Sequence, residues 1–162
     1  MKTHALKKYS LPLLAFTLLG CAPATGATSE TAKAATTATA TETAAKKGAL
    51  PATISQGAKI TLKDHLVPGK ITVFDFTSKF CPPCVRIAPM LDKLHAKRDD
   101  IAVVKVDINR PGIRGIDWGS PVAQQNGLKS IPYFMIYGAD GKLQAEGKKA
   151  SEMVIKWLEE LK

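Results

Sequence analysis

Two of the three cysteines in this chain stand two residues apart, in the segment FCPPC at positions 80–84. An apolar run at 71–76 precedes them, and apolar residues at helical spacing follow over 85–94. The sequence therefore places a dithiol where a strand passes into a helix. The first turn of a helix has free N–H groups and a partial positive charge, which favour a thiolate over a thiol at Cys81. Because the thiolate is the form that attacks disulfides, this pattern predicts thiol–disulfide exchange.

The order of the two cysteines predicts their roles. We expect Cys81 to be the nucleophile, because it lies nearest the helix start and should be the more exposed sulfur. Its attack on a substrate disulfide would give a mixed disulfide, which Cys84 would resolve by attacking Cys81. The electrons are then carried by sulfur, and we expect no cofactor and no metal.

Other uses of two cysteines stay open at this point. The pair could be a structural disulfide, or half of a zinc site, which usually needs four nitrogen or sulfur ligands. Cys21 is distant in the sequence, and His65 and His95 show no paired spacing that would complete such a site. A non-enzymatic module that holds Cu(I) on the two soft thiols is a further alternative.

Asp75 lies inside the apolar run that precedes the motif. A carboxylate in a buried strand is costly unless it is neutral, paired or hydrated. The functional interpretation is proton exchange with Cys84, whose thiol must lose its proton to resolve the mixed disulfide. The alternative is a purely structural carboxyl group.

The third cysteine follows a different kind of segment. Residues 1–10 carry three lysines, and residues 11–20 are apolar and end in Leu-Leu-Gly before Cys21. A basic head followed by a short apolar stretch and small residues is typical of a secretory signal. The apolar stretch is about half of the ~20 residues that a membrane-spanning helix needs, and it contains Pro12.

Leu-Leu-Gly-Cys resembles the lipobox of bacterial lipoproteins. We therefore expect residues 1–20 to be a signal peptide and Cys21 to be lipidated, which would anchor the protein to a bacterial membrane on its periplasmic side. Ala22, where an Asp would resemble an inner-membrane retention signal, favours the outer membrane. The alternatives are ordinary cleavage, which leaves Cys21 as a free thiol, and an uncleaved anchor.

Residues 21–50 predict a flexible tether after the anchor. Beyond Cys21 they are mostly Ala and Thr, with no aromatic side chain and Leu50 as the only large aliphatic one. Such a segment buries too little surface to offset the entropy of ordering it. As a random coil it would span roughly 30 Å.

Residues 51–162 have the composition of a single globular domain. Buried strands are predicted at 70–76 and 101–106, and a helix from Cys81 to about Lys97 with a kink at Pro89. Ser120-Pro121 should begin a second helix, which stops near Gly127. A hairpin around 139–142 and a final helix capped by Ser151 complete the series. This order implies an α/β fold in which helices cover both faces of a central mixed β-sheet.

The net charge of +9 does not indicate nucleic-acid binding. Removal of the three lysines in residues 1–20 lowers it to +6, and the remaining basic residues are scattered without an aromatic-studded stripe. We expect a monomer with a solvated surface.

With these elements in order, the chain resembles thioredoxin-fold proteins over residues 55–162. The resemblance is carried by Asp75, by the aromatic-Cys-x-x-Cys of Phe80, Cys81 and Cys84, and by Pro89 in the following helix. Two positions further along also match, the family's cis-proline at Ile131-Pro132 and the glycine after the hairpin at Gly147.

The resemblance implies a thioredoxin-like thiol–disulfide oxidoreductase. It adds Lys105 as the partner of Asp75, and Phe80, Ile131 and Pro132 as residues that contact the substrate. Tethered, exported members resemble bacterial thiol reductases (the TlpA-like type), which implies protein disulfides as substrates and a membrane protein as electron donor. A disulfide oxidase or isomerase is the alternative.

Two departures from the plain thioredoxin pattern concern the surroundings of the cysteines. Phe80 stands where many thioredoxins have Trp, and Pro82-Pro83 replaces Gly-Pro. The loop at 110–122 is also longer than its thioredoxin counterpart, and its Trp118 could line a substrate groove or fill the core.

Overall fold

The computed structural model of the chain describes residues 50–162. The signal peptide predicted for residues 1–20, the lipidation predicted at Cys21 and the tether up to residue 49 lie outside the described residues. None of the helices described for residues 50–162 combines the length and the apolar character that a membrane span requires.

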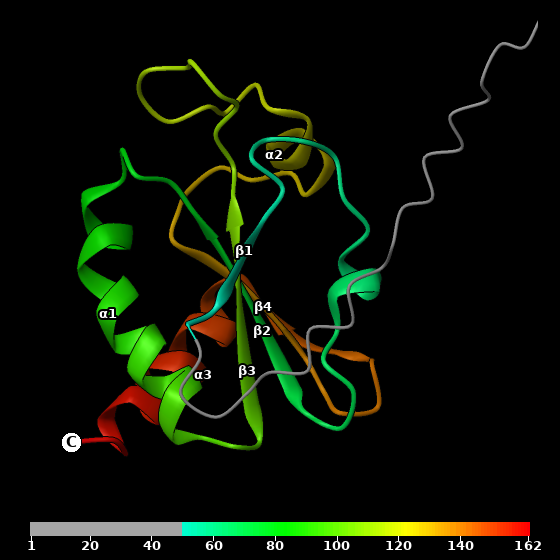
Figure 1. Cartoon of the computed structure of the whole chain (residues 1–162), viewed down its shortest axis with the longest axis vertical. Coiled ribbons are helices and arrows are strands. Elements are labelled where there is room, and N and C mark those ends of the chain that lie inside the picture. The colour runs from blue at the N-terminus through cyan, green and yellow to red at the C-terminus, as the bar shows by residue number, and fades with distance from the viewer. Residues whose placement is uncertain (1–49) are drawn as a thin grey trace, which may run out of the picture. The chain divides into compact units, whose positions relative to one another are not determined.

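A five-stranded mixed sheet forms the centre of the domain (Figure 1), in the order β1-β3-β2-β4-β5. Strands β1, β3 and β2 are parallel, whereas β4 runs antiparallel to β2 and β5 antiparallel to β4. The elements in chain order are β1 (Ala52–Ile54), the 3-10 helix η1 (Leu62–His65), β2 (Ile71–Thr77), α1 (Pro82–Lys97), β3 (Ile101–Asp107), α2 (Pro121–Gln125), β4 (Tyr133–Tyr137), β5 (Leu143–Glu146) and α3 (Gly147–Glu159).

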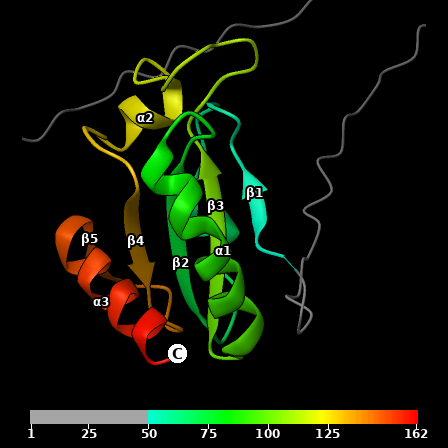
Figure 2. The same ribbon diagram turned by 90° about the vertical axis from the view of Figure 1, so that its left-hand side faces the viewer.

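Helical elements cover both faces of the sheet, as the sequence predicted. Alternate strand residues face opposite sides, so each long strand contributes to two separate cores. Helices α1 and α3 lie side by side over one face, which Figure 2 shows from the front. That core contains Val73, Leu91, Leu94, Val103, Ile136 and Val154. The core of the other face lies under η1 and α2 and contains Leu62, Phe74, Phe76, Val104, Val122 and Met135.

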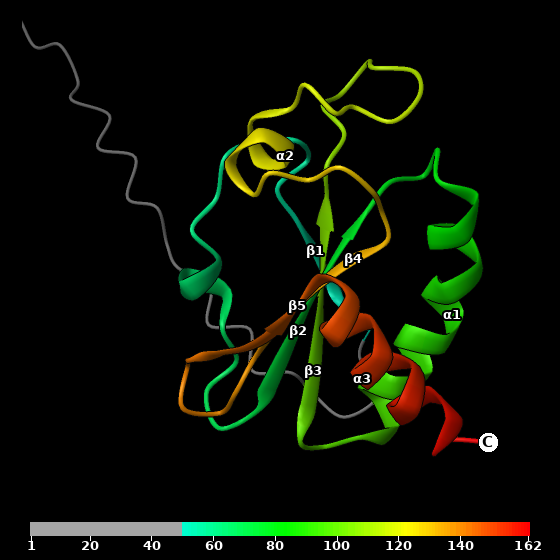
Figure 3. The ribbon, with the colours of Figure 1, turned by 180° about the vertical axis from the view of Figure 1, so that it is seen from behind.

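The ends of the parallel strands bring four loops to one edge of the sheet. β1, β2 and β3 all end there, and β4 begins there because Tyr133 pairs with Phe76 near the end of β2. In open α/β sheets this is the edge at which ligands bind. The edge, here termed the carboxyl edge, consists of residues 55–61, 78–81, 107–120 and 126–132 together with the first turn of α1, residues 82–86. It lies at the top of Figure 1 and, seen from behind, at the top of Figure 3.

Strand β1 was not predicted from the sequence. It has only three residues, Ala-Thr-Ile, and two of them continue the composition of the preceding Ala/Thr-rich segment. A segment this short shows no periodicity, and its pairing with β3 is what makes it a strand.

The start of the last helix was predicted wrongly. Helix α3 begins at Gly147, directly after β5, and Ser151 lies inside it. The Ser151 hydroxyl donates to the Gly147 carbonyl at 3.0 Å instead of capping the helix. Gly147 makes the abrupt change of direction possible, because it adopts a φ of +57° that other residues disfavour. The predicted cap at Ser120 is confirmed: its Oγ accepts the Ala123 N–H at 3.3 Å.

Gly57 ties β1 to the loops of the carboxyl edge. Its N–H donates to the Asp107 carbonyl at 2.8 Å, and its own carbonyl accepts the Val122 N–H at 3.3 Å. The residue has a φ of +80°, and a β-carbon there would lie 2.6 Å from the backbone nitrogen of Arg110. Only a glycine fits this close approach.

We therefore expect Gly57→Ala to lower the free energy of unfolding by about 3 kcal/mol. The strain of an alanine in the left-handed conformation accounts for ~1 kcal/mol of this loss, and the clash of its β-carbon with the Arg110 backbone accounts for the rest. Gly69→Ala is the matched control, because Gly69 has a φ of +73° but no atom within 4 Å of an added β-carbon. It should cost only about 1 kcal/mol. Urea unfolding of both variants measures the difference, and equal losses would contradict the proposed close approach.

Candidate active site

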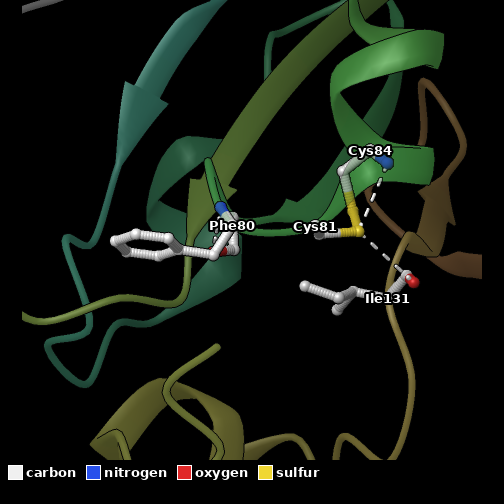
Figure 4. Close-up of a disulfide and its surroundings, with 5 residues drawn as sticks. Phe80, Cys81, Cys84 and Ile131 are labelled. Atoms are coloured by element: carbon white, nitrogen blue, oxygen red, sulfur yellow. Dashed lines mark hydrogen bonds between the residues drawn. A yellow bond between two sulfur atoms is a disulfide. The ribbon is translucent and has the colours of Figure 1, made fainter. Parts of the chain in front are cut away.

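Cys81 and Cys84 form a disulfide at the carboxyl edge, with their Cα atoms 5.3 Å apart. Cys81 caps helix α1, and Cys84 lies in its first turn, as Figure 4 shows. Cys81 is 2% exposed and Cys84 is 0% exposed. Cys81 is thus the more exposed of the two, as expected, but only a small part of it meets solvent. The Cα distance lies within the range that a disulfide bridges without movement of the backbone.

A single helical N–H contacts the sulfur of Cys81. The backbone N–H of Cys84 donates to the Cys81 Sγ at 3.2 Å. The two helix positions before Cys84 are Pro82 and Pro83, which have no N–H to donate. The sulfur therefore receives one direct hydrogen bond together with the partial positive charge of the helix start, and both favour the thiolate when the disulfide opens.

The Ile131–Pro132 peptide bond is cis, as the resemblance implied. It lies immediately before β4, across the carboxyl edge from the start of α1. The Ile131 carbonyl oxygen is 3.6 Å from the Cys81 Sγ (Figure 4). Main-chain groups of residue 131 thus stand beside the reactive sulfur, where an extended substrate segment could pair with them.

Phe80 lies next to the disulfide, but its ring points away from it (Figure 4). The ring is partly buried, and the Lys79 ammonium lies 5.1 Å from its centroid. A contact between Phe80 and substrate stays a prediction. Trp118 is 37% exposed, so the possibility that it fills the core is wrong.

Asp75 is buried on β2, where it is 1% exposed. It shares a sheet face with Val73, which packs under α1, the helix that begins next to Cys81. Neither carboxyl oxygen has a hydrogen-bond partner among residues 50–162. Burial raises the pKa of Asp75 to about 7, although the charge of Lys105 opposes this rise. A carboxyl group that titrates near neutral pH can both accept and release a proton during catalysis.

Lys105 stands next to Asp75 in the register of β2 and β3 but makes its ion pair elsewhere. Its Nζ donates to Oδ1 of Asp92, on α1, at 2.5 Å. Lys105 therefore makes no hydrogen bond to Asp75, and the predicted interaction between them is a longer-range electrostatic attraction. Asp92 also acts on Asp75 directly, since its negative charge adds to the raised pKa of Asp75. Sequence reasoning did not single out Asp92, because only the packing of α1 on β3 reveals its partner.

The described residues offer little for a resident metal. No group of three or more His, Cys, Asp or Glu side chains that could hold an ion occurs within residues 50–162. His95, treated above as a possible ligand, instead accepts the Val103 N–H on its Nδ1 at 3.0 Å.

Sequence comparison relates the chain to a known family. Residues 58–160 match the sequence profile of the Thioredoxin family. Thioredoxin H-type from Brassica oleracea is 33% identical over 93 residues, which cover 57% of this chain and 69% of that protein. Thioredoxin-2 from Saccharomyces cerevisiae is 35% identical over 68 residues, covering 42% and 58% of the two chains. Among solved structures, the thioredoxin NaTrxh from Nicotiana alata shares 31% identity over 56% of this chain and 73% of its own, with a TM-score of 0.42.

The raised pKa of Asp75 predicts how stability depends on pH. The pKa of this carboxyl group is about 3.9 in an unfolded chain but about 7 in the fold. The folded state therefore keeps the proton up to a higher pH than the unfolded state does. Stability should therefore fall as the pH rises from about 4 through 7, by up to about 4 kcal/mol. Asp75→Asn removes this titration, so its free energy of unfolding should change less over the same range. Parallel slopes for the two proteins in denaturant titrations from pH 4 to 8 would contradict the assignment.

Proposed function

This chain belongs to the thioredoxin family of thiol–disulfide oxidoreductases, and from that premise we propose that it reduces protein disulfides outside the cytoplasm while tethered to a bacterial membrane. The observation that carries the catalytic part is the Cys81–Cys84 pair at the start of α1, beside the Ile131 carbonyl. The tethered location rests on the sequence of residues 1–50, above all on Leu-Leu-Gly-Cys before position 22.

Reduction of a substrate takes two exchange steps. The Cys81 thiolate attacks one sulfur of the substrate disulfide, forms a mixed disulfide and releases the first substrate thiolate. Cys84, once deprotonated, attacks the Cys81 sulfur and releases the second substrate thiolate. The Cys81–Cys84 disulfide forms, and two electrons have passed from the dithiol to the substrate.

Asp75 supplies the proton acceptor for the second step. Cys84 is fully buried, so its thiol cannot lose its proton directly to bulk solvent. Asp75 lies on the sheet face under the same helix and titrates near neutral pH. We infer that it takes the Cys84 proton as Cys84 attacks, and that Lys105 moderates its affinity for that proton. Asp75→Asn should slow resolution of the mixed disulfide while the fold stays intact.

The oxidised pair must then be reduced again for another turnover. A dithiol on a membrane electron-donor protein would open the Cys81–Cys84 disulfide by the same two steps in reverse. The predicted tether of residues 21–50 would let the domain reach both this donor and its substrates. Ala22 after the predicted lipidation site favours the outer membrane as its anchor point.

Substitution of single cysteines tests the catalytic part. Cys81→Ser should abolish reduction of a protein disulfide, because no nucleophile remains. Cys84→Ser should accumulate the mixed disulfide with substrate, seen as an added mass on the intact chain. Cys21→Ser is the matched control and should retain turnover in solution. An active Cys81→Ser variant, or tight Cu(I) binding by the reduced wild type without any turnover, would overturn the proposal.

The location is tested by lipid labelling and fractionation of cells that express the full chain. The wild type should incorporate labelled fatty acid and sediment with membranes, because acyl chains on Cys21 bury methylene groups in the bilayer. Cys21→Ser should remain in the soluble periplasmic fraction without label. If the variant still sediments with membranes, the lipid anchor is wrong.

A further inference from the structure

The carboxyl edge carries a surplus of positive charge. The acidic groups on the segments of this edge, as defined above, are Asp107 and Asp117. Six basic residues stand on the same segments: Lys59, Lys79, Arg86, Arg110, Arg114 and Lys129. All six are exposed.

The opposite edge of the sheet is balanced. Its segments, residues 66–70, 97–100, 138–142 and 159–162, hold five basic and five acidic residues. Several of these charges pair locally, as Arg98 does with Asp100 and Glu160. The excess charge of the described residues is thus gathered at the carboxyl edge, which also carries the disulfide, and is not spread evenly over the domain.

A hollow of about 200 Å³ opens beside the motif at this edge. Lys79, two residues before Cys81, lines it together with Arg110 from the loop after β3. Thr53 and Gln56 from the end of β1 and Ile113 from the same long loop contribute to its wall. The lining therefore combines two cations with polar side chains, the exposed Ile113 and one carboxylate, Asp107. Lys79 and Arg110 outnumber this carboxylate, but Arg110 is paired with Asp117.

The long loop after β3 is held in shape by its own hydrogen bonds. The Arg110 guanidinium donates to both carboxyl oxygens of Asp117, at 2.7 and 2.9 Å. Asn109 Nδ2 donates to the Gly115 carbonyl at 2.6 Å. These contacts partly neutralise the charge of Arg110. They also fix the loop that carries Arg114, so the loop loses little conformational freedom when a partner docks.

We propose that the carboxyl edge selects protein substrates whose reactive disulfide is flanked by acidic residues, with the exposed Lys79, two residues before Cys81, as one of the contacts for a carboxylate. This inference rests on the proposed function and adds to it the class of substrate. Clustered cations attract an acidic partner over a distance and raise the rate of productive encounters. A membrane or a nucleic acid is a poorer occupant, because either would cover the sulfur that the substrate must reach.

The experiment compares three disulfide-bonded peptides that differ only beside their cysteines, with Glu, Gln or Lys at the flanking positions. The full chain is reduced beforehand and freed of reductant, and the second-order rate constant for reduction of each peptide in a single turnover is measured at 20 and 300 mM salt. The Glu peptide should react about tenfold faster than the Gln peptide at low salt, and the Lys peptide more slowly than either. The preference should shrink at high salt, because ions screen charges over about 6 to 10 Å.

Two variants with the same change in net charge test the location of the effect. Lys79→Gln with Arg114→Gln and Lys129→Gln removes three charges from the carboxyl edge and should abolish the preference for the Glu peptide. Lys70→Gln with Lys142→Gln and Lys162→Gln removes three charges from the opposite edge and should keep it. If both variants lose the preference for the Glu peptide equally, the total charge of the protein alone produces it, and the proposal is overturned.

Failure of this inference is distinct from failure of the proposed function. Turnover of the Gln peptide without any preference for Glu would overturn the acidic-substrate proposal and leave the reductase intact. No turnover of any peptide would overturn the proposed function itself. Binding to anionic phospholipid vesicles that depends on Lys79, Arg114 and Lys129, combined with no peptide preference, would assign these cations to a membrane surface instead.

Discussion

The start of helix α1 fixes the positions of both sulfurs in this domain. Cys81 is the capping residue, and the N–H that its sulfur accepts belongs to Cys84, which carries the second sulfur. Pro82 and Pro83 suit the positions between them, because the first N–H groups of a helix have no partner within it and proline has a helical φ already set. Helix geometry thus holds the Cα atoms 5.3 Å apart, and the bond can open and close on a backbone that stays in place.

The same two prolines limit how far the helix stabilises a thiolate at Cys81. The helix dipole still acts on the sulfur, but Cys84 supplies the only backbone hydrogen bond that the first helical turn gives it within the described residues. Across the carboxyl edge, the Ile131 carbonyl faces the same sulfur and offers no donor. The reactivity of Cys81 therefore depends on a balance between one N–H donor and the helix dipole, which favour the thiolate, and the neighbouring Ile131 carbonyl, which does not.

Stability and chemistry make opposite demands at Asp75. A buried carboxyl group without a hydrogen-bond partner costs folding free energy whenever it is ionised, and a hydrophobic residue would avoid that cost. Its burial is also what brings its pKa to about 7, where it can take a proton from Cys84. The ion pair between Lys105 and Asp92 sets the local field in which this titration occurs.

Much of the fold and the centre of the site could be predicted from the sequence, because they depend on local pattern. Long apolar runs mark β2 and β3, Ser120-Pro121 marks the start of α2, and Cys81 with Cys84 marks the start of α1. What the sequence did not reveal depends on tertiary pairing. Strand β1 exists only against β3, and the first residue of α3 depends on the backbone of Gly147.

The same limit applies to the charges around Asp75. The resemblance to thioredoxin-fold proteins implies Lys105 as the partner of Asp75, but the packing of α1 brings Asp92 closer to that lysine. Which carboxylate a lysine reaches is decided by how a helix lies on the sheet, and single-sequence patterns do not fix that. Trp118 is similar, since its exposure follows from a long loop whose shape depends on the pairing of Arg110 with Asp117.

The equilibrium reduction potential of the Cys81–Cys84 pair decides whether this dithiol donates electrons to its substrates. It is obtained by equilibrating the full chain with mixtures of reduced and oxidised dithiothreitol or glutathione. We expect a reversible two-electron couple at about −270 mV, the value of a reducing dithiol. A couple near −120 mV would mark an oxidant, and a bond that no reductant opens would mark a structural disulfide; either result would contradict a pair that donates electrons.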